Sequence, residues 1–404
     1  MNRTVVFSVI VAALGYFVDV YDLILFSVVR VASLKSILPP DADITATGIL
    51  LLNTQLAGML IGGIVWGVWG DKRGRLSILF GSILLYSLAN IANAFVTTVE
   101  MYALCRFLAG LGLAGELGAG ITLVAEILPK EKRGIGTAIV ATVGVTGGLT
   151  AALVGDLFPW KTAYIIGGGM GLALFALRLA VAESGMFTQT AQKADVRRGD
   201  LSMFFRNPSC FMRLLHCVLV GVPLWFIAGL IVTFAPEIGQ AIGLSGPASA
   251  GRAVLWFYGG LIAGDMASGL FSQYVQSRRK ALAIFIGGAF AGTIAILNLP
   301  AGASPEVFYY LTGITGFFSG YWAMFVTVAA EQFGTNLRAT AATSVPNLVR
   351  GGPILLATLF AVTKDALGVT LSLQIIGGAT FILALLSVWR MRETFGVDLD
   401  YTER

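Results

Sequence analysis

Twelve apolar runs, most of them between about 20 and 28 residues long, follow one another along almost the whole chain. A helix needs about 20 such residues to cross the hydrocarbon core of a bilayer. The expected spans are 4–31, 46–70, 76–97, 100–127, 135–155, 161–182, 211–234, 249–275, 281–299, 306–331, 339–363 and 369–390. We therefore expect an all-α membrane protein with twelve transmembrane helices.

Composition supports a membrane-embedded chain. Hydrophobic residues make up 56% of it and charged residues only 12%, against roughly a quarter charged in soluble domains. The 50 glycines suit helices that pack closely in a bilayer. The longest polar stretch, 183–208, divides the spans into two sets of six. We expect a six-helix bundle in 1–182, a cytoplasmic linker in 183–210, and a second bundle with a short cytoplasmic tail in 211–404.

The basic residues predict the orientation. If the N-terminus is cytoplasmic, 19 of the 27 Lys and Arg fall on the inner side and only five on the outer side. This asymmetry is the positive-inside pattern, and an even number of spans places both termini in the cytoplasm. We expect a multi-pass protein of a bacterial inner membrane. No basic run is long or interleaved with aromatics, so the net charge of +5 does not indicate nucleic-acid binding.

The second half of the chain repeats features of the first at an offset of 205 residues. Basic residues match in one loop and a Glu–Arg spacing of seven matches in another, both on the predicted inner side. The matched pairs are Arg73 with Arg278, Arg75 with Lys280, Glu126 with Glu331, and Arg133 with Arg338. Two halves in the same orientation form the parallel-repeat plan of many transporters, which places substrate at the midplane between the halves.

Two acids lie near the middle of the first apolar run. Asp19 and Asp22 are three residues apart, so they share one face of a helix. A charged side chain at bilayer depth costs about 2.5–3.5 kcal/mol on insertion scales. Such residues usually face a water-filled path and move protons or ions.

Four ordered motifs resemble those of the major facilitator superfamily. Residues 67–75, GVWGDKRGR, fit the loop signature between its second and third spans. Residues 106–134 resemble the fourth span of its sugar porters and metabolite:proton symporters, 183–187 resemble the run after its sixth span, and 331–339 resemble its second-half loop. One departure is Gln276, which stands where the family's second-half loop carries an acid, so a symmetric pair of gates is not implied.

The resemblance implies roles for the loop charges in gating. The acid corresponding to Asp71 is expected to meet span eleven and to close the cytoplasmic side. Gly67 and Gly74 permit close approach and a tight loop. The remaining expected gating residues are Arg73, Arg75, the pairs Glu126–Arg133 and Glu331–Arg338, and Asp265. The alternative is that these charges only mark an inner loop.

The resemblance also implies a proton site. Tyr21-Asp22 matches a span-one pair whose acid exchanges protons beside an Arg of span four, here Arg106. Asp19 is a second proton site or a substrate contact. Glu116, near the middle of span four, is expected to contact substrate, to relay protons or to be a paired structural acid. The competing interpretation of Asp22 and Arg106 is a static ion pair.

Span eleven carries a candidate substrate contact. Arg350 lies one turn from Asn347, between Pro346 and a Gly-Gly-Pro break. A buried guanidinium suits a carboxylate, which it can bind through two hydrogen bonds. The alternative is that Arg350 balances Asp265 or another acid. Further residues that could line the cavity are Trp225, Tyr258, Tyr321, Trp322 and Gln374.

These features favour a proton-coupled symporter that imports a small polar metabolite, such as an organic acid, by rocker-switch alternating access. The alternatives within transport are an exporter or antiporter, and a facilitative uniporter of a sugar, amino acid or organic cation. A membrane enzyme is disfavoured because the chain carries no hydrolase or zinc-protease motif. The three cysteines lack metal-ligand spacing. No cofactor or metal is expected, and the partners are the substrate, protons and lipid, with a monomer as the expected state.

Overall fold

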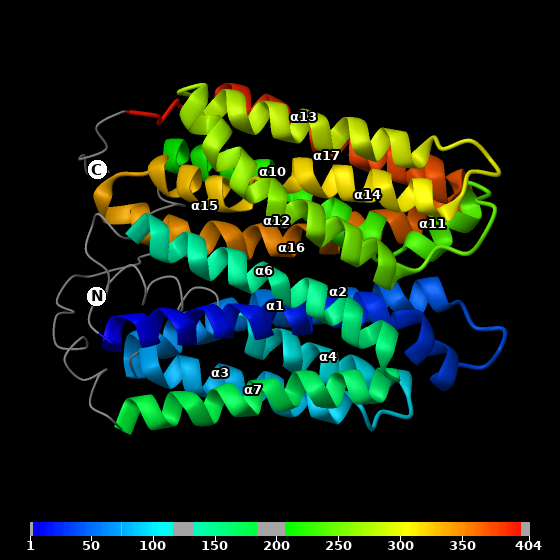
Figure 1. Ribbon diagram of the computed structural model, residues 1–404, viewed down its shortest axis with the longest axis horizontal. Coiled ribbons are helices and arrows are strands. Elements are labelled where there is room, and N and C mark those ends of the chain that lie inside the picture. The colour runs from blue at the N-terminus through cyan, green and yellow to red at the C-terminus, as the bar shows by residue number, and fades with distance from the viewer. Residues whose placement is uncertain (1–2, 74, 116–132, 184–206, 397–404) are drawn as a thin grey trace. The chain divides into compact units, whose positions relative to one another are not determined.

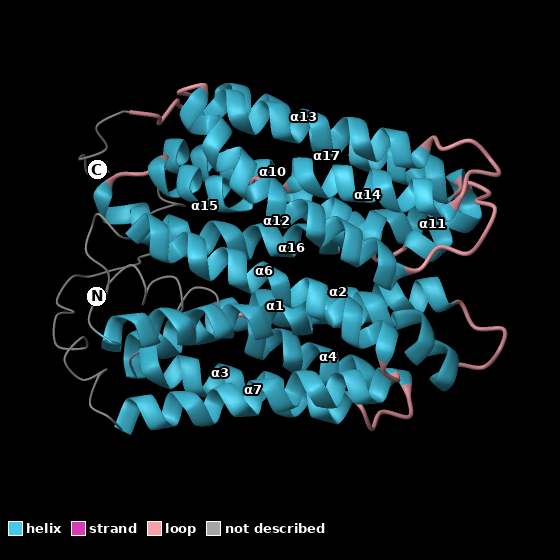
Figure 2. Cartoon of the chain, viewed as in Figure 1, coloured by secondary structure: helices cyan, strands magenta, loops and turns pink. Residues whose placement is uncertain are grey.

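A computed structural model describes residues 3–73, 75–115, 133–183 and 207–396, and all regular structure in these residues is helical (Figures 1 and 2). The chain divides into two compact units, Met1–Val196 and Arg197–Arg404. Most of the expected linker, residues 184–206, lies outside the described residues.

The first unit is built from six described helices. They are α1 (Arg3–Ile37), α2 (Ile44–Arg73), α3 (Arg75–Asn93), α4 (Val99–Leu113), α6 (Arg133–Leu157) and α7 (Trp160–Glu183). Each overlaps one of the first six expected spans. The short connections after α1, α3 and α6 fall at the expected boundaries between spans.

The second unit holds the other spans. Its helices are α10 (Pro208–Phe226) with the π-helix η2 (Ile227–Val232), α11 (Ala235–Ala241), α12 (Ala250–Tyr274), α13 (Arg278–Leu297), α14 (Pro305–Ser319), α15 (Trp322–Glu331), α16 (Thr335–Leu367) and α17 (Val369–Arg390). In the described part of the chain, nine helical segments are long and apolar enough to cross a membrane. The prediction of an all-α membrane fold is confirmed.

The same three helix pairings recur in both units. α1 packs against α6, α2 against α4, and α3 against α7. In the second unit α10 packs against α16, α12 against α14, and α13 against α17. These are the corresponding spans of the two halves, as the internal repeat predicts.

Glycines allow the second and fourth helices of each unit to approach closely. A Cβ on Gly110 of α4 would lie 2.0 Å from the carbonyl oxygen of Gln55 in α2. A Cβ on Gly264 of α12 would lie 1.9 Å from the carbonyl oxygen of Phe317 in α14. Any larger residue would push these helices apart, so glycine at these positions permits the contact.

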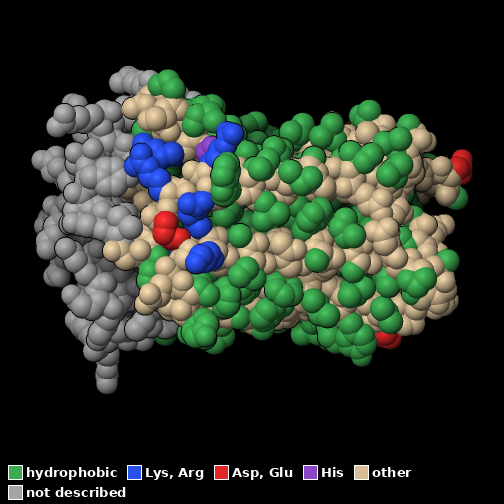
Figure 3. Space-filling model, turned by 90° about the horizontal axis from the view of Figure 1, so that it is seen from above, with side chains coloured by type: hydrophobic (Ala, Val, Ile, Leu, Met, Phe, Trp, Pro, Cys, Tyr) green, Lys and Arg blue, Asp and Glu red, His purple; other side chains and the backbone are tan. Residues whose placement is uncertain are grey.

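The surface is apolar along the helices. On the face shown in Figure 3, hydrophobic side chains spread over most of the length, and Lys and Arg gather at one end. Leu270, Val362 and Trp389 are all more than 70% exposed. Exposed apolar side chains of this size are typical of a surface that faces lipid.

Two spans depart from the single straight helices that the sequence predicts. The expected span 306–331 is two helices, α14 and α15, separated at Gly320 and Tyr321. The expected span 211–234 contains Pro223 and then changes to the π-helix η2. Proline removes a helical hydrogen bond, and π-turns often occur at functional sites.

Candidate functional site

The two acids of α1 are fully buried. Asp19 and Asp22 each have 0% exposed surface. Opposite them, a Cβ on Gly167 of α7 would lie 2.5 Å from Oδ1 of Asp22. The carboxyl group of Asp22 therefore packs directly on the backbone of α7, and a side chain at position 167 would displace it.

Arg106 of α4 is held by three other helices. Its Nη2 donates to Oε1 of Gln55 in α2, and its Nη1 donates to the hydroxyl of Tyr164 in α7 at 3.5 Å. The guanidinium lies 4.7 Å from the ring centroid of Phe26 in α1. The cation is thus fully buried among polar and aromatic partners.

Asp22 and Arg106 are electrostatic neighbours, and the amide of Asn90 also acts on this carboxyl. Among the residues that the structure describes, neither oxygen of Asp22 accepts a hydrogen bond within 3.5 Å, and no ion pair within 4.0 Å joins it to Arg106. The structure therefore brings the predicted proton-coupling pair together in one buried cluster, in an arrangement other than a direct bridge.

A chain of hydroxyl groups continues from Arg106 along the first unit. Tyr164 and Tyr102 are joined through their hydroxyls at 2.7 Å, and Tyr102 contacts Oγ of Ser33 at 3.1 Å. Ser33 donates to the carbonyl oxygen of Arg30 at 3.0 Å. Ser33 therefore accepts from Tyr102, which accepts from Tyr164, which accepts from Arg106. Every bond has a definite direction, and the chain fixes the position of the guanidinium.

In the second unit, three predicted substrate residues form a cluster. The guanidinium of Arg350 in α16 lies 5.6 Å from the ring centroid of Trp225 in α10. The rings of Trp225 and Trp322 meet edge to face, with centroids 6.0 Å apart. All three side chains are more than 90% buried. The indole Nε1 of Trp225 is buried and donates to no acceptor among the described residues.

Two residues of this cluster lie in irregular parts of their spans. Trp225 lies between Pro223 and the π-helix η2. Trp322 is the first residue of α15, directly after the break in the tenth span. Arg350 lies in α16, which continues as one helix through Pro346 and Pro353, so the expected Gly-Gly-Pro break is not present. Irregular backbone at membrane depth is tolerated where it is buried in protein or lines a cavity.

The other predicted lining residues have structural partners. Tyr321 donates its hydroxyl to the carbonyl oxygen of Val220 at 3.1 Å. Gln374 donates to Oδ1 of Asn298 at 3.1 Å, beside the end of α13. Tyr258 meets Phe257 edge to face at 5.5 Å. Asn347 is half-buried one turn before Arg350. Their part in substrate binding stays a prediction.

Asp265 of α12 caps a helix. Its Oδ1 accepts the backbone N–H of Ala323 at 3.1 Å, and its carboxyl group also lies near the backbone N–H of Trp322. Both amides belong to the first turn of α15. A carboxylate is favourable at this position because helix N-termini carry partial positive charge.

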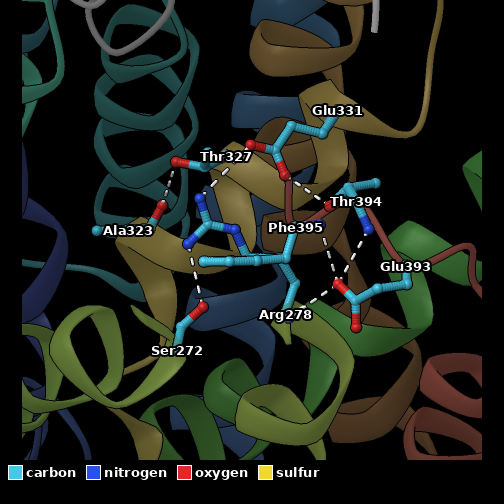
Figure 4. A network of polar contacts seen from close by, with 8 residues as sticks. All are labelled: Ser272, Arg278, Ala323, Thr327, Glu331, Glu393, Thr394 and Phe395. Carbon is cyan, nitrogen blue, oxygen red and sulfur yellow. Dashed lines mark hydrogen bonds and ion pairs between the residues drawn. The ribbon is translucent and has the colours of Figure 1, made fainter. Parts of the chain in front are cut away.

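Glu331 joins a polar network at the end of the second unit that carries the C-terminus (Figure 4). Its Oε1 lies 3.6 Å from Nη2 of Arg278, and its Oε2 accepts the hydroxyl of Thr394 at 2.6 Å. Arg278 also donates to Oγ of Ser272 at 3.1 Å. The sequence suggests Arg338 as the partner of Glu331; the side chain of Arg338 lies outside the described residues.

Sequence reasoning missed Glu393 in this network. Its carboxylate accepts the backbone N–H of Arg278 at 2.9 Å and of Phe395 at 3.0 Å, and the hydroxyl of Ser277. Partial burial raises the pKa of Glu393, but these hydrogen bonds outweigh burial and hold the pKa below its ordinary value. The available signal was the Glu-Thr pair at 393–394, within three residues of the end of the last expected span, in the segment that the sequence predicts to be a tail.

Several predicted site residues, or their side chains, fall outside the part of the chain that the structure describes. Gly74, Glu116 and Glu126 lie outside the described residues, as do the side chains at the other first-half loop positions, Asp71, Arg73, Arg75 and Arg133. Gly67 lies within α2. In the described part of the chain, no group of three or more His, Cys, Asp or Glu could hold a metal ion.

Comparison with known proteins adds the following. A sequence profile of the Major Facilitator Superfamily matches residues 5–358. The putative niacin/nicotinamide transporter NiaP of Bacillus subtilis (strain 168) is 26% identical, over 87% of this chain and 88% of its own length. The benzoate transport protein of Acinetobacter baylyi is 22% identical, over 82% and 78%. The inward-open xylose transporter XylE from E. coli has a similar fold, with a TM-score of 0.75, 16% identity and 97% coverage of both chains.

Proposed function

The chain belongs to the Major Facilitator Superfamily and is a multi-pass membrane transporter rather than an enzyme, and we propose that it imports a small aromatic carboxylate together with protons. The first unit would supply the proton site and the second unit the substrate site.

The observation that carries proton coupling is the environment of Asp22. Its carboxyl group is fully buried, lies beside Arg106 and has no hydrogen-bond donor within 3.5 Å among the described residues. An ionised carboxylate in such surroundings is unfavourable, so its protonation should depend on whether water reaches it. Gln55 and Tyr164 hold Arg106 close enough to influence that equilibrium. A group of this kind can link proton binding to a change in access.

The cluster in the second unit supports a planar acid as substrate. Arg350 supplies a guanidinium that binds carboxylates, and Trp225 and Trp322 supply aromatic faces for a ring. The Nε1 of Trp225 can donate to a ring nitrogen or hydroxyl of such a ligand. Two relatives are named for niacin and benzoate, both aromatic acids.

We further propose that two halves, 1–182 and 211–404, joined by 183–210, expose the site alternately to the two sides of the membrane. In this proposal, protonation of Asp22 and substrate binding together favour one of the two states. The distribution of basic residues supports cytoplasmic termini and an inner-membrane location.

Substrate-driven proton flux tests this function. Purified protein is reconstituted into vesicles, and benzoate, nicotinate, nicotinamide or xylose is added outside while the external pH is recorded. A symporter of aromatic acids makes the external medium alkaline with benzoate or nicotinate only. Acidification would instead indicate an antiporter. Uptake with no pH change would indicate a uniporter, and protein-free vesicles correct for passive acid permeation.

A further inference from the structure

We propose that Asp265 is a positioning residue for the substrate site: its carboxyl group caps α15 and thereby determines where the indole of Trp322 lies against Trp225. This inference rests on the proposed function for its effect on substrate, but its structural part can be tested without any ligand.

The break in the tenth span creates a helix start that must be capped. The first N–H groups of α15 have no helical partners. Tyr321, at the N-cap position, makes no side-chain hydrogen bond to that turn. Asp265 supplies the acceptor from α12 instead: its Oδ1 accepts the N–H of Ala323, the residue after Trp322. The cap therefore comes from another span, not from the local sequence.

Gly320 makes this contact possible. A Cβ at position 320 would lie 2.4 Å from the backbone N of Asp265 and 2.4 Å from the carbonyl carbon of Gly264. Because the backbone of the break touches the backbone of α12, the short side chain of Asp265 reaches the first turn of α15. A side chain at position 320 would separate the two segments and remove the cap.

Trp322 connects the cap to the substrate site. It directly precedes Ala323, whose backbone N–H Asp265 accepts, and its ring meets Trp225 edge to face at 6.0 Å. Trp322 also packs against Phe325, with the two ring centroids 5.3 Å apart. Trp225 in turn lies beneath Arg350. A shift of the first turn of α15 therefore moves the ring of Trp322 relative to Trp225, the residue that packs against Arg350.

The ligand-free experiment is near-ultraviolet circular dichroism of purified Asp265→Ala and Asp265→Asn. Coupling of two indoles depends on their mutual orientation. Asp265→Ala should change the tryptophan signal, in the direction of the change that Trp322→Phe causes, whereas Asp265→Asn keeps an acceptor oxygen and should remain close to the wild type. The control is Ser268→Ala, one turn further along α12, where the hydroxyl donates only to the carbonyl of Asp265.

The ligand experiment is a double-mutant cycle with benzoate and nicotinate as probes. If the ligand binds only the conformation in which α15 is capped, the free energy of the cap lowers affinity by about tenfold for Asp265→Ala. We expect a loss of about threefold for Asp265→Asn, which keeps an acceptor oxygen. In a Trp322→Phe background both losses should largely disappear, because the ring that Asp265 positions is then absent. If Asp265→Ala does not fold, the cycle is run with Asp265→Asn alone.

Two results would overturn the proposal: a tryptophan signal unchanged in Asp265→Ala, or affinity losses that add fully to that of Trp322→Phe. If the dichroism changes as expected but the wild type binds neither probe, the positioning role of Asp265 stands and the proposed substrate class fails.

Discussion

Each unit carries within a span one acid whose surroundings are clear, and the two differ. Asp22 in the first unit has no hydrogen-bond donor within 3.5 Å among the described residues and lies beside a cation. Asp265 in the second unit accepts the backbone N–H of Ala323 at a helix start. A carboxyl group with its hydrogen bonds made holds a structure in place. Asp22, which accepts none from the described residues, is the acid that we propose exchanges protons.

The two buried arginines have different neighbours. Arg106 is oriented by Gln55 and by the hydroxyl of Tyr164. Arg350 lies against the ring of Trp225. Both cations face aromatic rings, since Phe26 also lies against Arg106. In the function that we propose, the two halves share a fold but divide proton coupling and substrate binding between them.

The largest effect is expected from Asp22→Asn. The amide has nearly the same shape but cannot exchange a proton, so concentrative uptake of benzoate should be abolished while counterflow exchange persists. The measurement is accumulation in vesicles with an imposed pH gradient. The matched control is Asp265→Asn, which should still accumulate substrate. Equal loss in both variants would remove the distinction between the two acids.

Arg350→Lys should have the next largest effect. Lysine keeps the charge but not the planar fork that binds a carboxylate twice, so affinity for nicotinate should fall at least about tenfold. Nicotinamide, which lacks the carboxylate, provides the matched ligand: any binding of it should change little. Equal losses for both ligands would indicate that Arg350 supports the fold and not the anion.

Tyr164→Phe tests whether the hydroxyl chain matters for coupling. Removing the hydroxyl takes one acceptor from Arg106 and breaks the link to Tyr102, a loss of about 1 kcal/mol or about fivefold. We expect the accumulation ratio to fall by about that factor while counterflow is retained. Tyr310→Phe, at an exposed position, is the control. Unchanged accumulation would mean that Gln55 alone orients the guanidinium.

Hydropathy was sufficient to locate the spans because membrane crossing depends on length and apolar character, which are local. The break at Gly320 was hidden because the residues on both sides are apolar and its cap, Asp265, comes from another helix. The cluster of Arg350 with two tryptophans was only partly predictable. The sequence predicts each residue as a substrate contact, but their contacts with one another depend on how three separate helices pack and on the irregular backbone at Trp225 and Trp322. Glu393 was missed because its partners lie at the starts and ends of distant spans.

A third acid, Glu393, extends the comparison to a site that water reaches. It accepts backbone N–H groups, as Asp265 accepts that of Ala323, and it is only partly buried. Its pKa is lowered from the ordinary 4.5 in the folded state, so the unfolded state binds more protons just below that pH. The stability that Glu393 contributes is therefore present above pH 4.5 and is lost as the pH falls through the folded-state pKa.

Glu393→Gln should accordingly lower the free energy of unfolding by less than about 1 kcal/mol at pH 7, since solvent screens a partly exposed carboxylate. Thermal unfolding midpoints of the variant and the wild type should differ by a few degrees at most at pH 7 and converge as the pH falls below 4.5. Glu306→Gln, an exposed acid paired with Arg252, is the control and should change neither value measurably. If the difference in unfolding midpoint between Glu393→Gln and the wild type were as large below pH 4.5 as at pH 7, the Glu393 side chain would stabilise this network by packing and not by its charge.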